Sequence, residues 1–153
     1  MSSGASSPAG QCLVVGYDRT DSARLAAEWA AGELSPRGKL VIVHASRPLH
    51  APTSPLSSLQ ERRELGQALI DELLLEADGS LLEVEIEAEI SDRDPVNALI
   101  AAATRHRARA IVVGSERHSR LHKALGTVTS QLMERSPVPV TVIPVSAAVP
   151  STA

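Results

Sequence analysis

Aromatic residues are almost absent from this chain of 153 residues, which has no phenylalanine, one tryptophan and one tyrosine. Proteins that bind single-stranded nucleic acid stack bases on aromatic side chains, so the composition argues against that class. An excess of basic residues is also lacking, since the net charge is −3. A general DNA-binding or membrane-surface function is therefore disfavoured as well.

Cysteine is equally scarce. Cys12 is alone, so no disulfide can form within the chain, and a cytoplasmic location is predicted.

No uncharged run has the length of a membrane span. Residues 1–10 are predicted to be a disordered lead without signal-peptide character, and residues 147–153 a flexible tail. The remaining residues, 11–146, are predicted to form a single domain with an aliphatic core.

Apolar runs of strand length alternate with helical patterns along the chain. Continuous apolar runs predict buried strands at residues 11–17, 40–45 and 111–113. At residues 82–90, glutamates alternate with Val, Ile and Ala, which predicts a strand with one wet face. Two prolines place the last strand, residues 138–145, at a sheet edge. Helices are predicted between these strands, at about residues 23–34, 57–77, 95–105 and from 127 onward.

This alternation predicts an α/β fold with a five-stranded parallel open sheet and helices on both faces. The three apolar strands belong inside, whereas the half-wet strand and the proline-containing strand belong at the edges. The strand order 3-2-1-4-5 satisfies both conditions. It places the loops after Tyr17 and Val113 on either side of the switch point, where open α/β sheets bind ligands.

The stretch from Ala110 to Thr129 joins a strand, a basic loop and the start of a helix. Its Gly126-Thr127-Val128-Thr129 segment is typical of a helix N-terminus that presents backbone N–H groups to an anion. The alternative is an ordinary turn glycine with a threonine cap. Basic residues that include Arg117 and His118 make the loop either an anion-attracting rim or a solvated surface. No carboxylate or cysteine completes a metal-binding set there, so no metal site is predicted.

Four segments together resemble the universal stress protein family, and the resemblance extends from Gln11 to Val145. They read LVVGYDRTDSA (13–23), SDRDPVNALIAAA (91–103), ARAIVVGS (108–115) and GTVTSQLMERSPVPVTVIPV (126–145). ATP-binding members of that family carry a loop of the form G-x2-G-x9-G-[ST]. Gly114 fits the first glycine and Gly126-Thr127 the last pair, but Arg117 replaces the second glycine and the loop is one residue shorter.

The resemblance implies a dimeric bacterial stress-response protein that binds ATP, AMP or ADP with magnesium. Phosphates would lie against the loop from Gly114 to Thr129, and Asp18 would contact adenosine or a phosphate-bound metal. His44 and Ala45, at the end of the second strand, would offer backbone groups to adenine. Two copies would pair through the last strand, Val138 to Val145, and signal to an unknown protein partner.

Two alternatives stay open. Arg117 and the shortened loop favour a dimeric scaffold of the same family that has lost nucleotide binding. An enzyme acting on phosphoryl groups is the third hypothesis, and it amounts at most to a weak ATPase. No catalytic residue is predicted, because no general base or water-positioning residue can be named.

Overall fold

The computed structural model describes residues 11–34, 37–45, 59–77, 79–115 and 126–144. The predicted lead at 1–10 and tail at 147–153 lie outside these residues. None of the described helices is both long and apolar enough to cross a membrane. Strands and helices alternate in the order β1 (Cys12–Gly16), α1 (Asp21–Leu34), β2 (Lys39–Ala45), α2 (Leu59–Glu76), β3 (Glu85–Ser91), α3 (Pro95–His106), β4 (Ala110–Ser115), α4 (Thr127–Arg135) and β5 (Val140–Pro144), with a 3₁₀ turn, η2 (Gly79–Glu83), before β3.

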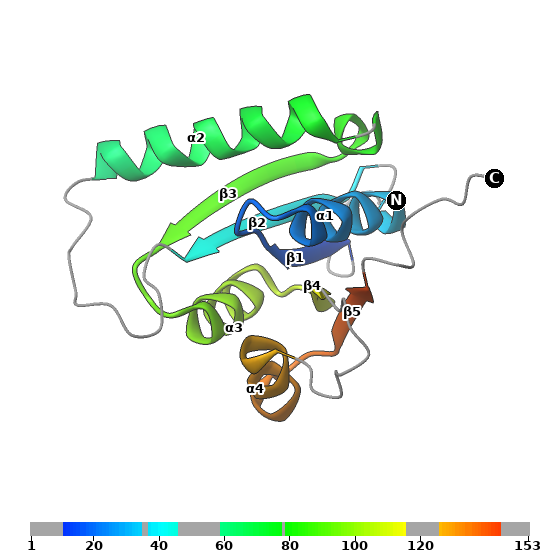
Figure 1. Ribbon diagram of the computed structural model, residues 1–153, viewed down its shortest axis with the longest axis vertical. Helices are drawn as coiled ribbons and strands as arrows, with labels where there is room; N and C mark the ends of the chain where they lie inside the picture. Colours follow the sequence, from blue (N-terminus) through cyan, green and yellow to red (C-terminus); the bar gives the residue numbers. More distant parts are fainter. Residues whose placement is uncertain (1–10, 35–36, 46–58, 78, 116–125, 145–153) are drawn as a thin grey trace, which may run out of the picture.

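The strands form one parallel sheet in the order β3-β2-β1-β4-β5, which confirms the predicted topology. Helices α1 and α2 pack on one face, and α3 and α4 on the other, as Figure 1 shows. The connections that leave β1 and β4, which are neighbours in the sheet, therefore run to opposite faces. This is the position at which the two adjacent strand ends leave a crevice.

The core is aliphatic and lies on both faces of the three central strands. Along β1, Leu13 and Val15 face α1 and α2, whereas Cys12 and Val14 face α3 and α4. Fully burying a Val, Leu or Ile side chain contributes roughly 1.5–3 kcal/mol. Strands that are apolar throughout gain this on both faces, so they occupy the middle of the sheet.

The predicted start of the third strand was wrong. A strand was expected from residue 82, but the chain first makes the 3₁₀ turn η2 and enters β3 at Glu85. The turn buries Leu81, which is 1% exposed, in the cluster beneath α1 and α2, and leaves Leu82 74% exposed. Packing of one leucine thus overrides the alternating pattern for these first residues.

Two helix starts show how the sequence positions the crevice. Asp94 caps α3, because its Oδ1 accepts a hydrogen bond from the Asn97 N–H at 3.0 Å, and Pro95 follows at the first helical position. At α1 the cap is Thr20, whose hydroxyl accepts from the Ala23 N–H at 3.2 Å. Asp18, three residues before α1 begins, lies beside the crevice.

Candidate functional site

A pocket of about 190 Å³ lies where β1, β2 and β4 end, between the starts of α1, α3 and α4. Most of the site residues predicted from the sequence line it. These are Tyr17, Asp18, His44, Ala45, Gly114, Val128 and Thr129. Gly126 and Thr127 begin α4 beside it but are not part of its wall, and Arg117 and His118 lie outside the described residues.

The β1 side of the pocket is held by backbone hydrogen bonds. The Tyr17 N–H donates to the Val43 carbonyl at 2.9 Å, and the Tyr17 carbonyl accepts from His44 Nδ1 at 3.0 Å. A carbonyl only accepts, so Nδ1 of His44 is the donor in this bond. The Tyr17 ring is buried in the core, and this burial raises its pKa. Tyr17 thus presents its backbone rather than its phenol to a ligand.

Asp18 projects an exposed carboxylate from the rim of the pocket. Its Oδ1 accepts hydrogen bonds from both the N–H and the hydroxyl of Thr20, the residue that caps α1. These bonds fix the carboxylate next to the turn and leave Oδ2 without a hydrogen bond from the described residues. An acceptor held in this way suits the hydroxyl groups of a sugar or a hydrated cation.

The opposite side of the pocket is the first turn of α4. Gly126 precedes it with φ −62° and ψ 165°, and no side chain of the described residues caps the helix. The N–H groups of the first turn therefore have no intrahelical acceptor, and the helix dipole places partial positive charge there. Thr129 is 7% exposed, lines the pocket, and its hydroxyl has no hydrogen-bond partner among the described residues. Donors in this arrangement suit an anion.

Gly114 is explained by packing as well as by its place in the pocket. A Cβ built on it would lie 2.5 Å from the carbonyl carbon of Ser22 and closer still to the carbonyl oxygen. These are main-chain atoms of α1, so no side-chain rotation relieves the clash. Glycine at this position lets the start of α1 approach β4. At Gly126, by contrast, no atom lies within 4 Å of such a Cβ.

Several wall residues were not among those predicted. They are Gly16, Ser22, Ala23, Val43, Pro95, Leu99 and Val113. Periodicity assigns residues such as Leu99 to the core, and the structure does bury Leu99 at 3% exposure. The useful signal was the predicted strand order, because it places the first turns of three helices around one switch point.

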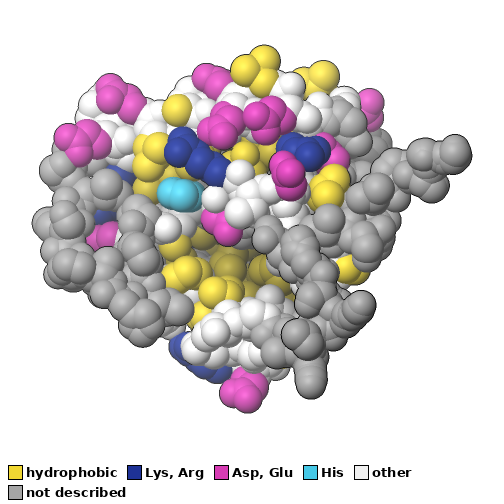
Figure 2. Space-filling model, viewed as in Figure 1, with side chains coloured by type: hydrophobic (Ala, Val, Ile, Leu, Met, Phe, Trp, Pro, Cys, Tyr) yellow, Lys and Arg dark blue, Asp and Glu magenta, His cyan; other side chains and the backbone are white. Residues whose placement is uncertain are grey.

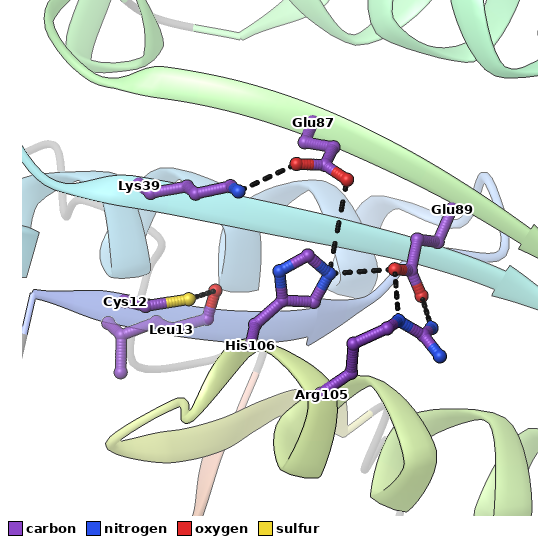
Figure 3. Close-up of polar contacts among 7 residues, drawn as sticks. All are labelled: Cys12, Leu13, Lys39, Glu87, Glu89, Arg105 and His106. Carbon is purple, nitrogen blue, oxygen red and sulfur yellow. Dashed lines mark hydrogen bonds and ion pairs between the residues drawn. The ribbon is translucent and has the colours of Figure 1, made fainter. Parts of the chain in front are cut away.

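A second polar cluster joins β2, β3 and α3 (Figure 3). His106 Nε2 lies 2.7 Å from Glu89 Oε2 and 3.9 Å from Glu87 Oε2. Lys39 Nζ contacts Glu87 Oε1 at 2.7 Å, and Arg105 pairs with Glu89. The two carboxylates and the imidazole could hold a cation by their spacing. Because Lys39 and Arg105 already neutralise both carboxylates, the cluster is an ion-pair network that ties β3 to its neighbours.

Because of this network, the β3 glutamates are not all exposed to solvent as the sequence predicts. Its glutamates were predicted to form a wet face, and Glu85 is indeed exposed. The side chain of Glu89, however, is only 18% exposed. Burial raises its pKa, but hydrogen bonds from Arg105 and His106 outweigh burial, and the net pKa is lowered. Glu89 is therefore a partly buried, ion-paired residue and not a fully solvated group.

Comparison with known proteins found a matching family model and several similar solved structures. The model of the universal stress protein family matches residues 11–144. The universal stress protein UspA from Lactobacillus plantarum is 20% identical, with 87% of this chain and 97% of that chain covered and a TM-score of 0.61. A universal stress protein in complex with cAMP is 25% identical, with 87% and 95% covered and a TM-score of 0.53.

A third similar structure is the universal stress protein from Archaeoglobus fulgidus in complex with dAMP. It is 21% identical, with 87% of this chain and 97% of that chain covered and a TM-score of 0.55. No curated protein sequence matches the chain.

Proposed function

Because the chain belongs to the universal stress protein family, we propose that it binds an adenine nucleotide in the pocket where β1 and β4 end. The observation that carries the proposal is the α4 side of this pocket. It combines a helix N-terminus that no described side chain caps and a buried threonine hydroxyl that has no hydrogen-bond partner among the described residues. Both features need an acceptor, and phosphate oxygens supply one.

The proposed binding mode divides the ligand between the two walls. Phosphates lie against the N–H groups of Val128 and Thr129. The sugar lies at the Asp18 carboxylate, and adenine lies at the backbone of Ala45, where β2 ends. Magnesium accompanies a di- or triphosphate and is shared between its oxygens and water. Similar proteins solved with cAMP and dAMP support an adenine nucleotide as the ligand class.

We also propose that two copies pair through β5. Among the described strands, β5 pairs with β4 alone, and the Ile111 N–H donates to the Pro139 carbonyl at 2.9 Å. Because peptide groups alternate in direction along a strand, those of Val140 and Val142 point away from β4. Both valines are only partly buried, and Figure 2 shows apolar side chains gathered in the region of α3, β4 and α4. A second copy covers this surface.

In this proposal the protein is a cytoplasmic regulator whose nucleotide state is passed to a partner. Its single free cysteine, Cys12, is buried, and burial raises the pKa of the thiol. This suits a reducing compartment.

Calorimetry with matched glycine variants tests nucleotide binding. We expect ATP with magnesium to bind the wild type, and Gly126→Val to lose at least about tenfold in affinity because its side chain blocks approach to the α4 amides. Gly32→Val is the control, since a Cβ at Gly32 also meets nothing within 4 Å but lies on the outer side of α1. Equal affinity of the two variants would place the phosphates elsewhere.

A specific observation favours a second candidate, the dimeric scaffold without nucleotide. Gly114, the first motif glycine, is required by the close approach of Ser22 whether or not a ligand binds. Its presence is therefore no sign of phosphate contact. This candidate predicts that purified protein releases no adenine-containing compound on denaturation and that no binding is seen at millimolar ATP. The dimer should persist in that case.

A further inference from the structure

Helix α4 is held on the sheet by few buried side chains. Of its nine residues, Thr129 and Leu132 are buried, and Val128 is partly buried against the same cluster as Leu132. Figure 1 shows α4 beside α3, on one face of the sheet. The hydrophobic effect has no preferred direction, so this apolar contact keeps α4 on the cluster without fixing its angle. Directional polar bonds are needed to fix the angle.

A set of such bonds joins the last turn of α4 to the first turn of α3. Asp94 accepts two hydrogen bonds from Asn97, one from the backbone N–H to Oδ1 at 3.0 Å and one from Nδ2 to Oδ2 at 2.7 Å. Because the Asn97 amide nitrogen is turned toward Asp94, its Oδ1 is free to accept from Arg135 Nη2 at 2.8 Å. We refer to Asp94, Asn97 and Arg135 as the α3–α4 link.

The charge on Asp94 keeps the α3–α4 link oriented. The hydrogen bond from the Asn97 backbone lowers the pKa of Asp94, and the nearby Arg135 acts in the same direction. Asp94 is therefore a carboxylate at neutral pH, and a carboxylate only accepts hydrogen bonds. The Asn97 amide thus has one favourable orientation, in which its oxygen faces α4.

The α3–α4 link lies outside the pocket, but both helices reach the pocket wall. Asn97 and Arg135 are not part of this wall, whereas Pro95, the first residue of α3, and Thr129 are. Thr129 precedes Arg135 by six residues, a separation of about 9 Å along a helix. Leu132, which is 0% exposed, lies halfway between them. A rotation of α4 about Leu132 therefore moves its first turn as far as its last turn.

From this arrangement we propose that Asn97 and Arg135 are positioning residues for the phosphates of the ligand, because they set the angle at which α4 presents its first N–H groups to the pocket. This role rests on the proposed nucleotide site. The attraction of an anion to a helix N-terminus is confined to the first turn, and hydrogen bonds weaken steeply when donors point away. When the link is broken, the Val128 and Thr129 N–H groups no longer point together at one phosphate.

Amide spectra of the ¹⁵N-labelled full chain without nucleotide test the position of α4. Arg135→Met keeps the aliphatic stem and removes the donor, whereas Asn97→Ala removes the acceptor and leaves the charge of Arg135 in place. Both variants should shift the Val128 and Thr129 amides in the same direction. Glu134→Met is the matched control, because Glu134 is an exposed neighbour in the same turn, and it should leave these two amides unchanged.

Calorimetry with ATP and magnesium measures the effect on binding. Arg135→Met and Asn97→Ala should each weaken binding roughly threefold to tenfold, although neither residue touches the pocket. The double variant should lose no more than either single variant, because all three break the same bond. Glu134→Met should bind like the wild type. Circular dichroism checks that each variant is folded at the temperature of the titration.

Three results overturn the positioning role. The first is unchanged Val128 and Thr129 amides in both variants, even if the melting temperature falls, because the link would then be only structural. The second is a wild type and variants that bind ATP equally well. The third is an additive loss in the double variant. A wild type that itself binds no ATP overturns the proposed function and this role with it, so the two failures are told apart by the wild-type titration.

Discussion

Replacing Gly114 by alanine tests the close contact between α1 and β4. The added Cβ would lie 2.5 Å from the Ser22 carbonyl carbon and 3.0 Å from Ser22 Cβ. Carbon atoms of this kind pack at about 3.5–4.0 Å, so α1 has to move by roughly 1 Å from its place on the sheet. The helix contributes Ala23, Ala26, Ala27, Ala30 and Ala31 to the core, so the shift disturbs a long interface.

Overpacking of this kind costs about 1–3 kcal/mol of unfolding free energy. For a domain of this length, each 1 kcal/mol lowers the melting temperature by roughly 2–4 °C. Gly114→Ala should therefore melt roughly 2–12 °C below the wild type when nucleotide is absent. The matched control is Gly126→Ala, where no atom lies within 4 Å of the new Cβ.

Differential scanning calorimetry on nucleotide-free protein separates the two glycines. We expect Gly126→Ala to stay within about 1 kcal/mol of the wild type, because its φ of −62° suits any residue. A Gly114→Ala protein that melts with the wild type would refute the packing argument. Ligand binding would then be the only remaining explanation for a glycine at this position.

Three further predictions follow from single contacts. Asp94→Ala removes the cap that binds the Asn97 N–H, so urea unfolding should show a loss of about 0.5–2 kcal/mol. The lowered pKa of Glu89 stabilises the fold above its ordinary value of 4.5, and this contribution is lost as the pH falls. Urea titrations from about pH 6 to about pH 3 should thus show a smaller loss of stability for Glu89→Gln than for the wild type; equal slopes would contradict this. Gly32→Ala, on the exposed side of α1, should raise the melting temperature by roughly 2–4 °C, and an unchanged or lower value would count against the helical environment.

The strand order was predictable because the composition of each strand indicates whether the strand lies inside the sheet or at an edge. Runs such as Leu40–Val43 are apolar on both sides and must be covered on both faces, whereas the glutamates of β3 and the prolines around β5 restrict those strands to edges. Once the order is fixed, the switch point follows from topology alone. The pocket residues at the ends of β1, β2 and β4 could therefore be predicted from the sequence.

Long-range packing was not predictable from local pattern. The residues around Gly114 in the sequence do not indicate that Ser22, much earlier in the chain, lies so close to it in the fold. In the same way, the alternation of β3 predicts a wet glutamate face, but only the fold places Arg105 and His106 of α3 over Glu89. These contacts depend on how two helices sit on the sheet, and a single sequence does not encode that in any one segment.

The most direct test of nucleotide binding is an amide chemical-shift titration of the ¹⁵N-labelled protein with ATP and magnesium. The account predicts saturable shifts at Asp18, Ala45, Val128 and Thr129, the residues proposed to contact sugar, adenine and phosphates. Absence of shifts at millimolar nucleotide, or shifts confined to residues away from the ends of β1 and β4, would contradict it.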